Sequence, residues 1–156
     1  MGTATLEHDI RDHRLVETLR VWRKLCGTRF APARHDIEPA DFRQMLGRLA
    51  LIDVVPGASG AARYRYRLMG TRLAAQDACD LTGKPLSEHP DAGQREIVQA
   101  AFDAACETRR PAYREDVRQD GARRHTYARL VLPLSDDGAT VTGLLLARVV
   151  LNRAMS

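Results

Sequence analysis

The residues best suited to binding a small molecule are tyrosines and arginines that alternate along short segments of the chain. One arginine, Arg65, separates Tyr64 from Tyr66, and Arg129 follows Tyr127 by two positions. Residues two apart share one face of a β-strand. Tyrosine offers an apolar ring with a hydroxyl group for hydrogen bonding, and a guanidinium group binds carboxylate or phosphate through two parallel hydrogen bonds. These residues predict a pocket wall, whereas the alternative is a filled core.

The orientation of Arg129 is open between two alternatives. If its strand face looks inward, Arg129 could clamp a carboxylate or phosphate ligand. If that face looks outward, Arg129 is a solvated residue of the sheet. The residues that alternate with it, Ala128, Leu130, Leu132 and Leu134, form the more apolar face of the strand, and this pattern favours the outward orientation.

Patterns for catalysis and metal binding are absent from the sequence. It contains no nucleophile elbow, no Gly-rich phosphate loop and no paired carboxylate motif. Asp53 could be a general base of a small isomerase, but its alternating strand favours solvent exposure or a pair with an arginine of segment 63–67. None of the five histidines has the i, i+4 spacing of a zinc helix. We therefore expect neither an enzyme nor a metal site.

The first element that must position these residues is an amphipathic helix over residues 9–26. Leu15, Leu19 and Trp22 recur there at helical spacing. This stripe either packs back on the sheet or forms a two-fold dimer seam. Because the arginine-rich face of the sheet is poorly suited to cover it, we predict that Leu15, Leu19 and Trp22 form a homodimer interface.

The remaining elements are two strands, then helices, then three strands. Asp-Gly dipeptides at positions 120–121 and 137–138 are strong hairpin signals between the last three strands. The expected helices cover residues 39–45, 72–79 and 91–108, and the expected strands cover 49–55, 64–68, 112–119, 123–134 and 140–151. This order indicates an α+β fold, an antiparallel sheet with helices gathered on one face.

Length and composition exclude several classes of protein. The 156 residues fit one domain, and the three cysteines have no paired spacing, which argues for reduced thiols. No apolar run approaches the roughly 20 residues of a membrane span, and no secretion signal is recognisable, so we expect a cytoplasmic protein. The net charge of +4 raises nucleic acid as a partner, but the arginines are spread among 20 acidic residues and make that partner unlikely.

The order and spacing of the segments resemble the PAS superfamily of sensor domains, in particular a bacterial single-domain branch with an N-terminal helix. The resemblance rests on RYRYRLMGTRL (63–73), DLTGKPLSE (80–88), YARLVLPLSDDG (127–138) and VTGLLLARVVL (141–151). It implies a five-stranded antiparallel sheet in the spatial order 2-1-5-4-3. We accordingly divide the chain into an N-terminal helix and tail, residues 1–27, and a PAS-like domain, residues 28–152.

The resemblance also implies a ligand pocket between the sheet and the helices. Its candidate residues are Ile52, Val54, Tyr64, Tyr66, Leu68, Phe102, Tyr113, Tyr127 and Arg129. Haem-binding members need a proximal histidine on a helix over the pocket, whereas His89 lies in a Pro-flanked loop and His125 opens a strand. Photoactive flavin members carry Asn-Cys-Arg-Phe, whereas Cys79 lies in Ala-Cys-Asp-Leu. Haem and flavin are therefore disfavoured, and the cofactor is left open.

The function that these observations predict is a non-catalytic sensory or regulatory module. It would bind a small ligand, a signalling-protein partner or both, and respond by a shift between two arrangements of helices and sheet. The usual Asp-Ile-Thr signal-transfer ending of the family is replaced by Val150-Leu151-Asn152. The alternatives are a ligand-free dimerisation scaffold and an arginine-mediated binder of nucleic acid or an acidic partner.

Overall fold

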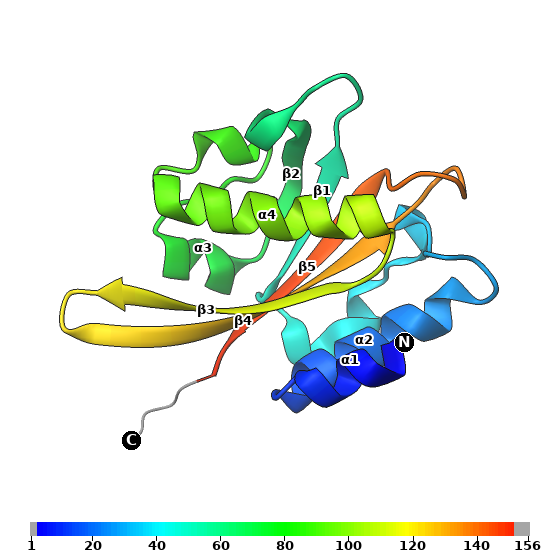
Figure 1. Ribbon diagram of the computed structural model, residues 1–156, viewed down its shortest axis with the longest axis horizontal. Coiled ribbons are helices and arrows are strands. Elements are labelled where there is room, and N and C mark those ends of the chain that lie inside the picture. Colours follow the sequence, from blue (N-terminus) through cyan, green and yellow to red (C-terminus); the bar gives the residue numbers. More distant parts are fainter. Residues whose placement is uncertain (1–2, 152–156) are drawn as a thin grey trace.

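The computed structural model describes residues 3–151 and contains one five-stranded antiparallel sheet with helices on both faces (Figure 1). The spatial order of the strands is β2-β1-β5-β4-β3. Their bounds are β1 Leu49–Val54, β2 Tyr64–Met69, β3 Ala112–Asp120, β4 Arg123–Leu134 and β5 Gly143–Val150. These findings confirm the predicted fold class and strand order. Residues 1–2 and 152, which the predicted segments include, lie outside the described residues.

The helical elements are short except for two. They are α1 Thr3–Asp9, α2 His13–Cys26, η1 Arg34–Asp36, η2 Pro39–Met45, η3 Gly60–Arg63, α3 Thr71–Asp77, η4 Leu86–Glu88 and α4 Ala92–Thr108. The helix predicted over residues 9–26 is corrected to α2, which begins at His13, and α1 is an additional helix before it. Its start was placed too early because Asp12 is the N-cap of α2, where its side chain accepts a 2.8 Å hydrogen bond from the backbone N–H of Arg14.

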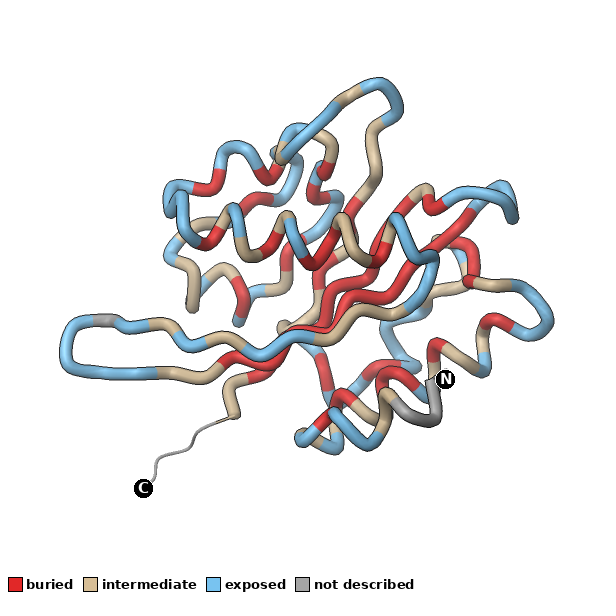
Figure 2. The backbone as a smooth tube through the Cα atoms, in the orientation of Figure 1, coloured by how far each residue is buried: buried red, intermediate tan, exposed pale blue. Residues whose placement is uncertain are grey.

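The inner face of the sheet is the face that α3 and α4 cover. Ile52, Tyr66 and Phe102 are buried in this layer together with Val131 and Leu146 of the central strands. The burial pattern in Figure 2 follows the sheet and the inward side of α4. Apolar contact therefore fills the middle of the inner face.

The outer face is the opposite face, and α2 and η2 cover it. Leu15, Leu19 and Trp22 are at most 3% exposed within the single chain, and the Trp22 Nε1–H donates a 2.8 Å hydrogen bond to the carbonyl oxygen of Pro133. The dimer interface predicted for these three side chains is therefore wrong, and packing on the sheet is the alternative that the structure shows. The physical reason is that β4 and β5 present an apolar outer face to α2.

A bulge in β2 changes the direction of one predicted pocket residue. Leu51 pairs with Leu68 but Ile52 pairs with Tyr66, so Arg67 is an extra residue in the ladder. Tyr66 faces inward, whereas the extra residue turns Leu68 to the outer face, where it is 53% exposed. Leu68 is therefore removed from the candidate pocket.

The start of α3 is fixed against the segment that precedes β1. The backbone N–H groups of Arg72 and Leu73 donate to the carbonyl oxygen of Gly47 at 2.9 and 3.2 Å. A Cβ atom on Gly70 would lie 2.4 Å from the same oxygen, so this close approach requires glycine. The seven-residue helix then carries Asp77, its last residue, over the inner face.

Candidate functional site

Two buried arginines lie directly opposite each other on the inner face. Arg129 of β4 is paired in register with Arg148 of β5, and the two residues are 0% and 2% exposed. Side chains at directly opposite positions are neighbours on the same face, and like charges placed there destabilise a sheet. Two buried arginines at opposite positions are therefore expected only where nearby carboxylates balance their charge or where the pair serves a function.

A buried carboxylate, that of Asp77, binds three cationic or polar side chains. Its Oδ1 accepts hydrogen bonds from Arg148 Nη2 at 2.9 Å and from Arg118 Nη1 at 3.1 Å, and its Oδ2 lies 3.4 Å from His89 Nε2. Burial by itself raises the pKa of Asp77, but the hydrogen bond from His89 and the charges of Arg148 and Arg118 outweigh it and lower the pKa well below its usual range. Asp77 is therefore an anion that ties α3 to β3 and β5.

The protonation of His89 follows from its two neighbours. The backbone N–H of Asp91 donates to His89 Nδ1 at 3.1 Å, so the proton of the neutral ring is on Nε2 and points to Asp77. Asp91 is also the N-cap of α4, through a 3.1 Å hydrogen bond from the N–H of Gln94. His89 thus connects the carboxylate of Asp77 to the beginning of α4.

The second carboxylate of the site is that of Asp116 on the edge strand β3. Its Oδ1 accepts a 2.6 Å hydrogen bond from Arg129 Nη1, while its Oδ2 has no hydrogen-bond partner among the described residues. Arg129 Nε and Nη2 likewise have none among the residues that the structure describes. Burial lowers the pKa of Arg129, Asp116 raises it, and the neighbouring charge of Arg148 lowers it further.

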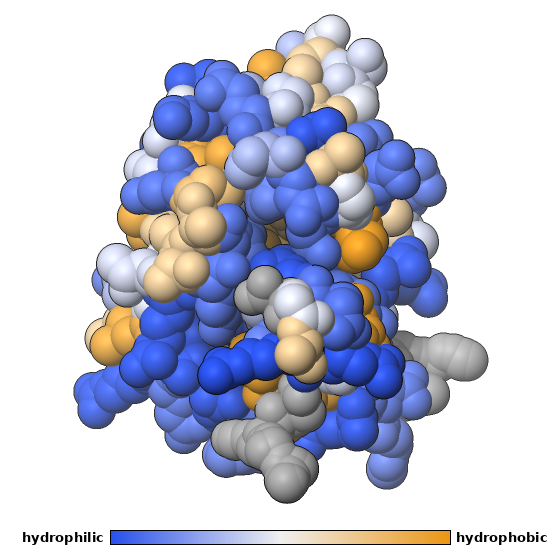
Figure 3. Space-filling model, turned by 90° about the vertical axis from the view of Figure 1, so that its left-hand side faces the viewer, coloured by the Kyte–Doolittle hydropathy of each residue, from blue (hydrophilic) through white to orange (hydrophobic). Residues whose placement is uncertain are grey.

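These side chains form one unit, which we call the arginine cluster. Its members are Asp77, His89, Asp116, Arg118, Arg129 and Arg148. The cluster lies beside the β3–β4 hairpin, at an end of the molecule whose surface is mainly hydrophilic (Figure 3). Arg118 and Asp116 have side chains 16% and 15% exposed, so the cluster reaches solvent along the edge strand.

Two tyrosines border the arginine cluster. The ring of Tyr127 lies under the guanidinium groups of Arg118 and Arg148, at 4.6 and 4.9 Å from its centroid, which is cation–π geometry. Burial raises the pKa of Tyr66, and the charge of Asp77 raises it further, while Arg129 and Arg148 act against this increase. The phenol of Tyr66 therefore borders the guanidinium groups in its neutral form.

The other end of the inner face carries a smaller polar contact. Tyr64 donates a hydrogen bond to the carboxylate of Asp103 on α4, and its ring packs edge-on against Phe102 with centroids 5.0 Å apart. Burial, followed by the hydrogen bond to Asp103, raises the pKa of Tyr64. The inner face therefore places polar groups at both of its ends, with apolar residues between them.

The structure brings most of the predicted pocket residues to the inner face and moves two away. Tyr113 pairs in register with Leu130 and packs with the outer layer, so it is corrected for the same reason as Leu68: the ladder decides its face. Arg129 faces inward and is fully buried. The outward orientation was favoured because the residues that alternate with Arg129 form the more apolar face of β4, and that face packs beneath α2 on the outer side. The residues placed on the inner face are Ile52, Val54, Tyr64, Tyr66, Phe102, Tyr127 and Arg129.

Sequence reasoning missed five members of the arginine cluster: Asp77, His89, Asp116, Arg118 and Arg148. Arg148 carried a usable signal, because it interrupts the otherwise apolar run of β5. His89 was considered only as a haem ligand. Asp77 and Arg118 carried no signal, because a carboxylate at the end of a short helix and an arginine in an edge strand are ordinary surface residues.

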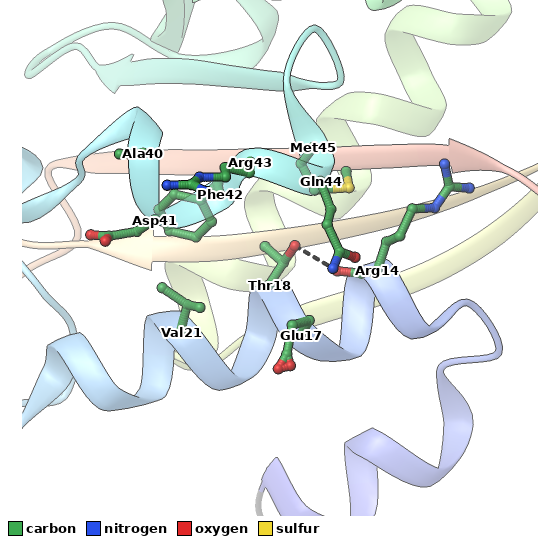
Figure 4. Close-up of a pocket in the computed structure, with 10 residues that line it drawn as sticks. All are labelled: Arg14, Glu17, Thr18, Val21, Ala40, Asp41, Phe42, Arg43, Gln44 and Met45. Atoms are coloured by element: carbon green, nitrogen blue, oxygen red, sulfur yellow. Dashed lines mark hydrogen bonds between the residues drawn. The ribbon is translucent and has the colours of Figure 1, made fainter.

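Two surface hollows lie on the outer side, away from the arginine cluster. One, of about 150 Å³, lies between α2 and η2, and it is lined by Arg14 and Thr18 of α2 and by Phe42, Gln44 and Met45 of η2 (Figure 4). In it, Thr18 Oγ1 donates a 2.8 Å hydrogen bond to the Arg14 carbonyl oxygen. The hydroxyl group of Thr18 is thus engaged within α2.

The second hollow is an apolar groove of about 130 Å³ lined by residues that include Leu46, Leu68 and Phe42. Asp53 lies on the neighbouring strand β1 and forms a 3.0 Å ion pair with Arg67, which confirms the predicted pairing of this carboxylate with an arginine of segment 63–67.

No group of three His, Cys, Asp or Glu side chains in the described part of the chain is placed to hold a metal ion. None of the helices within residues 3–151 has both the length and the apolar character needed to cross a membrane.

Comparison with known proteins supplies the family. A profile of the family described as PAS domain matches residues 10–146, from three residues before α2 into β5. The chain belongs to the PAS domain family. A search of curated proteins finds no match.

Solved structures share the PAS fold at low sequence identity. VqmA of Vibrio cholerae bound to DPO is 15% identical, with a TM-score of 0.55, and the match covers 72% of this chain and 56% of VqmA. The PAS domain of BvgS from Bordetella pertussis is 12% identical, with a TM-score of 0.51, over 67% of this chain and 76% of that domain. A sensor histidine kinase from Vibrio cholerae is 12% identical, with a TM-score of 0.50, over 72% of this chain and 89% of that one. Each of them is similar in fold.

Proposed function

We propose that this PAS domain is a non-catalytic sensory or regulatory module that binds a small molecule at the arginine cluster and signals to a protein partner. The observation that carries the proposal is the position of Asp77. One buried carboxylate holds α3, the loop before α4, β3 and β5 together through His89, Arg118 and Arg148. The occurrence of PAS domains in a ligand-bound receptor and a sensor kinase supports it.

The mechanism would be a shift between two arrangements of α3 over the sheet. A ligand that forms hydrogen bonds with the arginines competes with Asp77 for them. Its differential affinity for an arrangement in which α3 is released sets how far the equilibrium moves. The signal would therefore leave through α3 and the beginning of α4, the elements that Asp77 and His89 connect.

Native mass spectrometry of freshly purified protein tests this function. The folded species is compared with the denatured chain, and we expect additional mass on the folded species that is lost on denaturation. The control is the Arg65→Gln variant, in which the replaced side chain is exposed on β2 and the added mass should persist. A folded species that carries no added mass and is not stabilised by any ligand tested would instead favour a ligand-free scaffold.

Homodimerisation also stays a prediction, but it needs a surface other than the α2 stripe. Leu15, Leu19 and Trp22 are buried against the sheet of the same chain. Sedimentation equilibrium over a range of concentrations measures the mass directly. A monomer at all concentrations would exclude the scaffold alternative, which requires the dimer.

A further inference from the structure

One edge of the Arg129 guanidinium is unused although the side chain is fully buried. Arg129 Nη1 binds Asp116, whereas Nε and Nη2 have no partner within the described residues. Nε and Nη2 form the side-on edge of the planar group, whose two parallel N–H bonds match the two oxygens of a carboxylate. Buried donors left without a partner are destabilising, so this edge is suited to an anion.

The charges around this edge do not cancel. The cluster contains three guanidinium groups, those of Arg118, Arg129 and Arg148, and two carboxylates, those of Asp77 and Asp116. His89 contributes no charge in the hydrogen-bonding arrangement described above. The excess within the cluster is one positive charge, which one negative charge would balance; Arg114, which pairs in register with Arg129 on β3, is exposed to solvent and is not counted in the cluster. Arg148 Nε, which also has no partner among the described residues, lies on the strand beside Arg129.

Apolar residues continue the site along the same two strands. Val131 and Leu146 are each two positions from an arginine of the pair and lie opposite each other in register. Both are buried in the inner layer. The tail of a molecule held by its charged end at Arg129 would therefore meet aliphatic side chains, but only after the helices over the inner face move apart, because Val131 and Leu146 are buried.

We propose that the ligand of the arginine cluster is a small organic monocarboxylate with an aliphatic tail, bound side-on by Arg129 and neighboured by Arg148. This inference rests on the proposed function and specifies its ligand class. A planar carboxylate provides two oxygens for the free edge and one negative charge for the excess. A phosphate monoester can also accept two parallel hydrogen bonds from a guanidinium group, but it carries more than the one negative charge that balances the cluster.

Titration followed by the arginine Nε–H signals in ¹⁵N-correlated NMR spectra tests the ligand class. Sodium butyrate is the main probe, formate is the probe without a tail, and inorganic phosphate and chloride are added at equal ionic strength. We expect the Nε–H signal of Arg129 to shift and saturate with butyrate, and at higher concentration with formate. A shift equally large with chloride would reveal an adventitious ion only, and tighter binding of phosphate would overturn the carboxylate class.

Variants show whether Arg129 is the binding group. Arg129→Leu leaves Asp116 without its partner, so Arg129→Leu combined with Asp116→Asn is the variant that should keep the fold. Its butyrate affinity, measured by thermal denaturation, should fall by about tenfold or more, because hydrogen bonds to charged groups contribute about 1.5–3 kcal/mol. Arg65→Gln is the matched control and should bind butyrate as the wild type does. An unchanged affinity in the folded double variant would overturn the inference.

The two proposals fail in distinguishable ways. If the folded protein carries a bound molecule that the double variant retains, the monocarboxylate site is wrong and the sensory function stands. If no added mass is found and neither butyrate nor formate shifts any arginine signal, both proposals fail.

Discussion

The outer and inner faces of the same sheet are covered by helices in very different ways. On β4, Leu130 and Leu132 point to the outer face and are buried beneath α2, whereas Tyr127 and Arg129 alternate with them and point to the inner face. The outer layer is closed by apolar packing and one hydrogen bond from Trp22. The inner layer is closed at one end by guanidinium groups and carboxylates.

This difference separates a structural layer from one that is suited to signalling. Apolar burial contributes to stability roughly in proportion to the area removed from water and has little geometric preference. A buried ion pair must overcome the desolvation of its charges, and a well-packed apolar pair of similar volume is often as stable. The chain therefore keeps charges on the inner face at a cost in stability, at the place where we propose that a ligand competes for them.

The largest expected loss of stability comes from a substitution in the outer layer. Trp22→Ala removes a buried indole ring and should lower the free energy of unfolding by about 3–5 kcal/mol, measured by urea denaturation with circular dichroism because Trp22 is the only tryptophan. Trp22→Phe keeps most of the packing and should cost roughly 1 kcal/mol for the unpaired carbonyl of Pro133. A cost for Trp22→Ala below that of Trp22→Phe would show that α2 does not cover the sheet in solution.

A smaller loss of stability is expected when Asp77, the carboxylate at the centre of the arginine cluster, is replaced. Asp77→Asn removes the negative charge that Arg118 and Arg148 share, and should lower the free energy of unfolding by roughly 3 kcal/mol at neutral pH. The same denaturation experiment measures it, with Asp53→Asn as the control because the Asp53–Arg67 pair is exposed and worth at most about 1 kcal/mol. Equal costs for the two variants would remove the distinction between this buried cluster and an ordinary surface ion pair.

The pH dependence of stability sharpens the same comparison. The pKa of Asp77 is lowered in the folded protein, so its stabilisation is fully present above the unfolded value of about 3.9 and is lost as the pH falls toward the folded value. The free energy of unfolding of the wild type should therefore decrease below about pH 4 more steeply than that of Asp77→Asn. Parallel pH profiles for the two proteins would contradict the ionised state of Asp77.

The smallest expected effect concerns a residue that the bulge in β2 moves to the outer surface. Leu68→Gln should change the free energy of unfolding by no more than about 0.5 kcal/mol, whereas Tyr66→Ala on the inner side of the same strand should cost several times more. Thermal denaturation of both variants measures the difference. A large cost for Leu68→Gln would place its side chain inside the fold and contradict the register of β1 and β2.

Local patterns predicted the elements well because their causes are local. The Asp-Gly dipeptides placed both turns of the last three strands, and the alternation over residues 64–67 placed Tyr64 and Tyr66 on one face. The order of strands and helices was sufficient for the family resemblance, which the match over residues 10–146 confirms. The first helix was predicted to begin at residue 9, before the N-cap Asp12, and α1 was not predicted.

The candidate site was predicted only in part because it is assembled from distant segments. Tyr127 and Arg129 were named from their spacing in one strand, but Asp77 meets Arg148 across 71 positions of sequence and Arg118 across 41. Such a contact leaves no local period. Arg148 within the apolar run of β5 was the one available indication that a charge had been buried.

The sequence by itself thus determined the elements, the antiparallel sheet and the alternation of side chains along each strand, since turn chemistry and hydrophobic period act over a few residues. The tertiary structure decided which face each strand turned inward and which charges met there. Covering both faces of the sheet buried Trp22 against β4, and the bulge at Arg67 reversed Leu68. Neither outcome is encoded within one segment, because each depends on the register and packing of segments far apart in the chain.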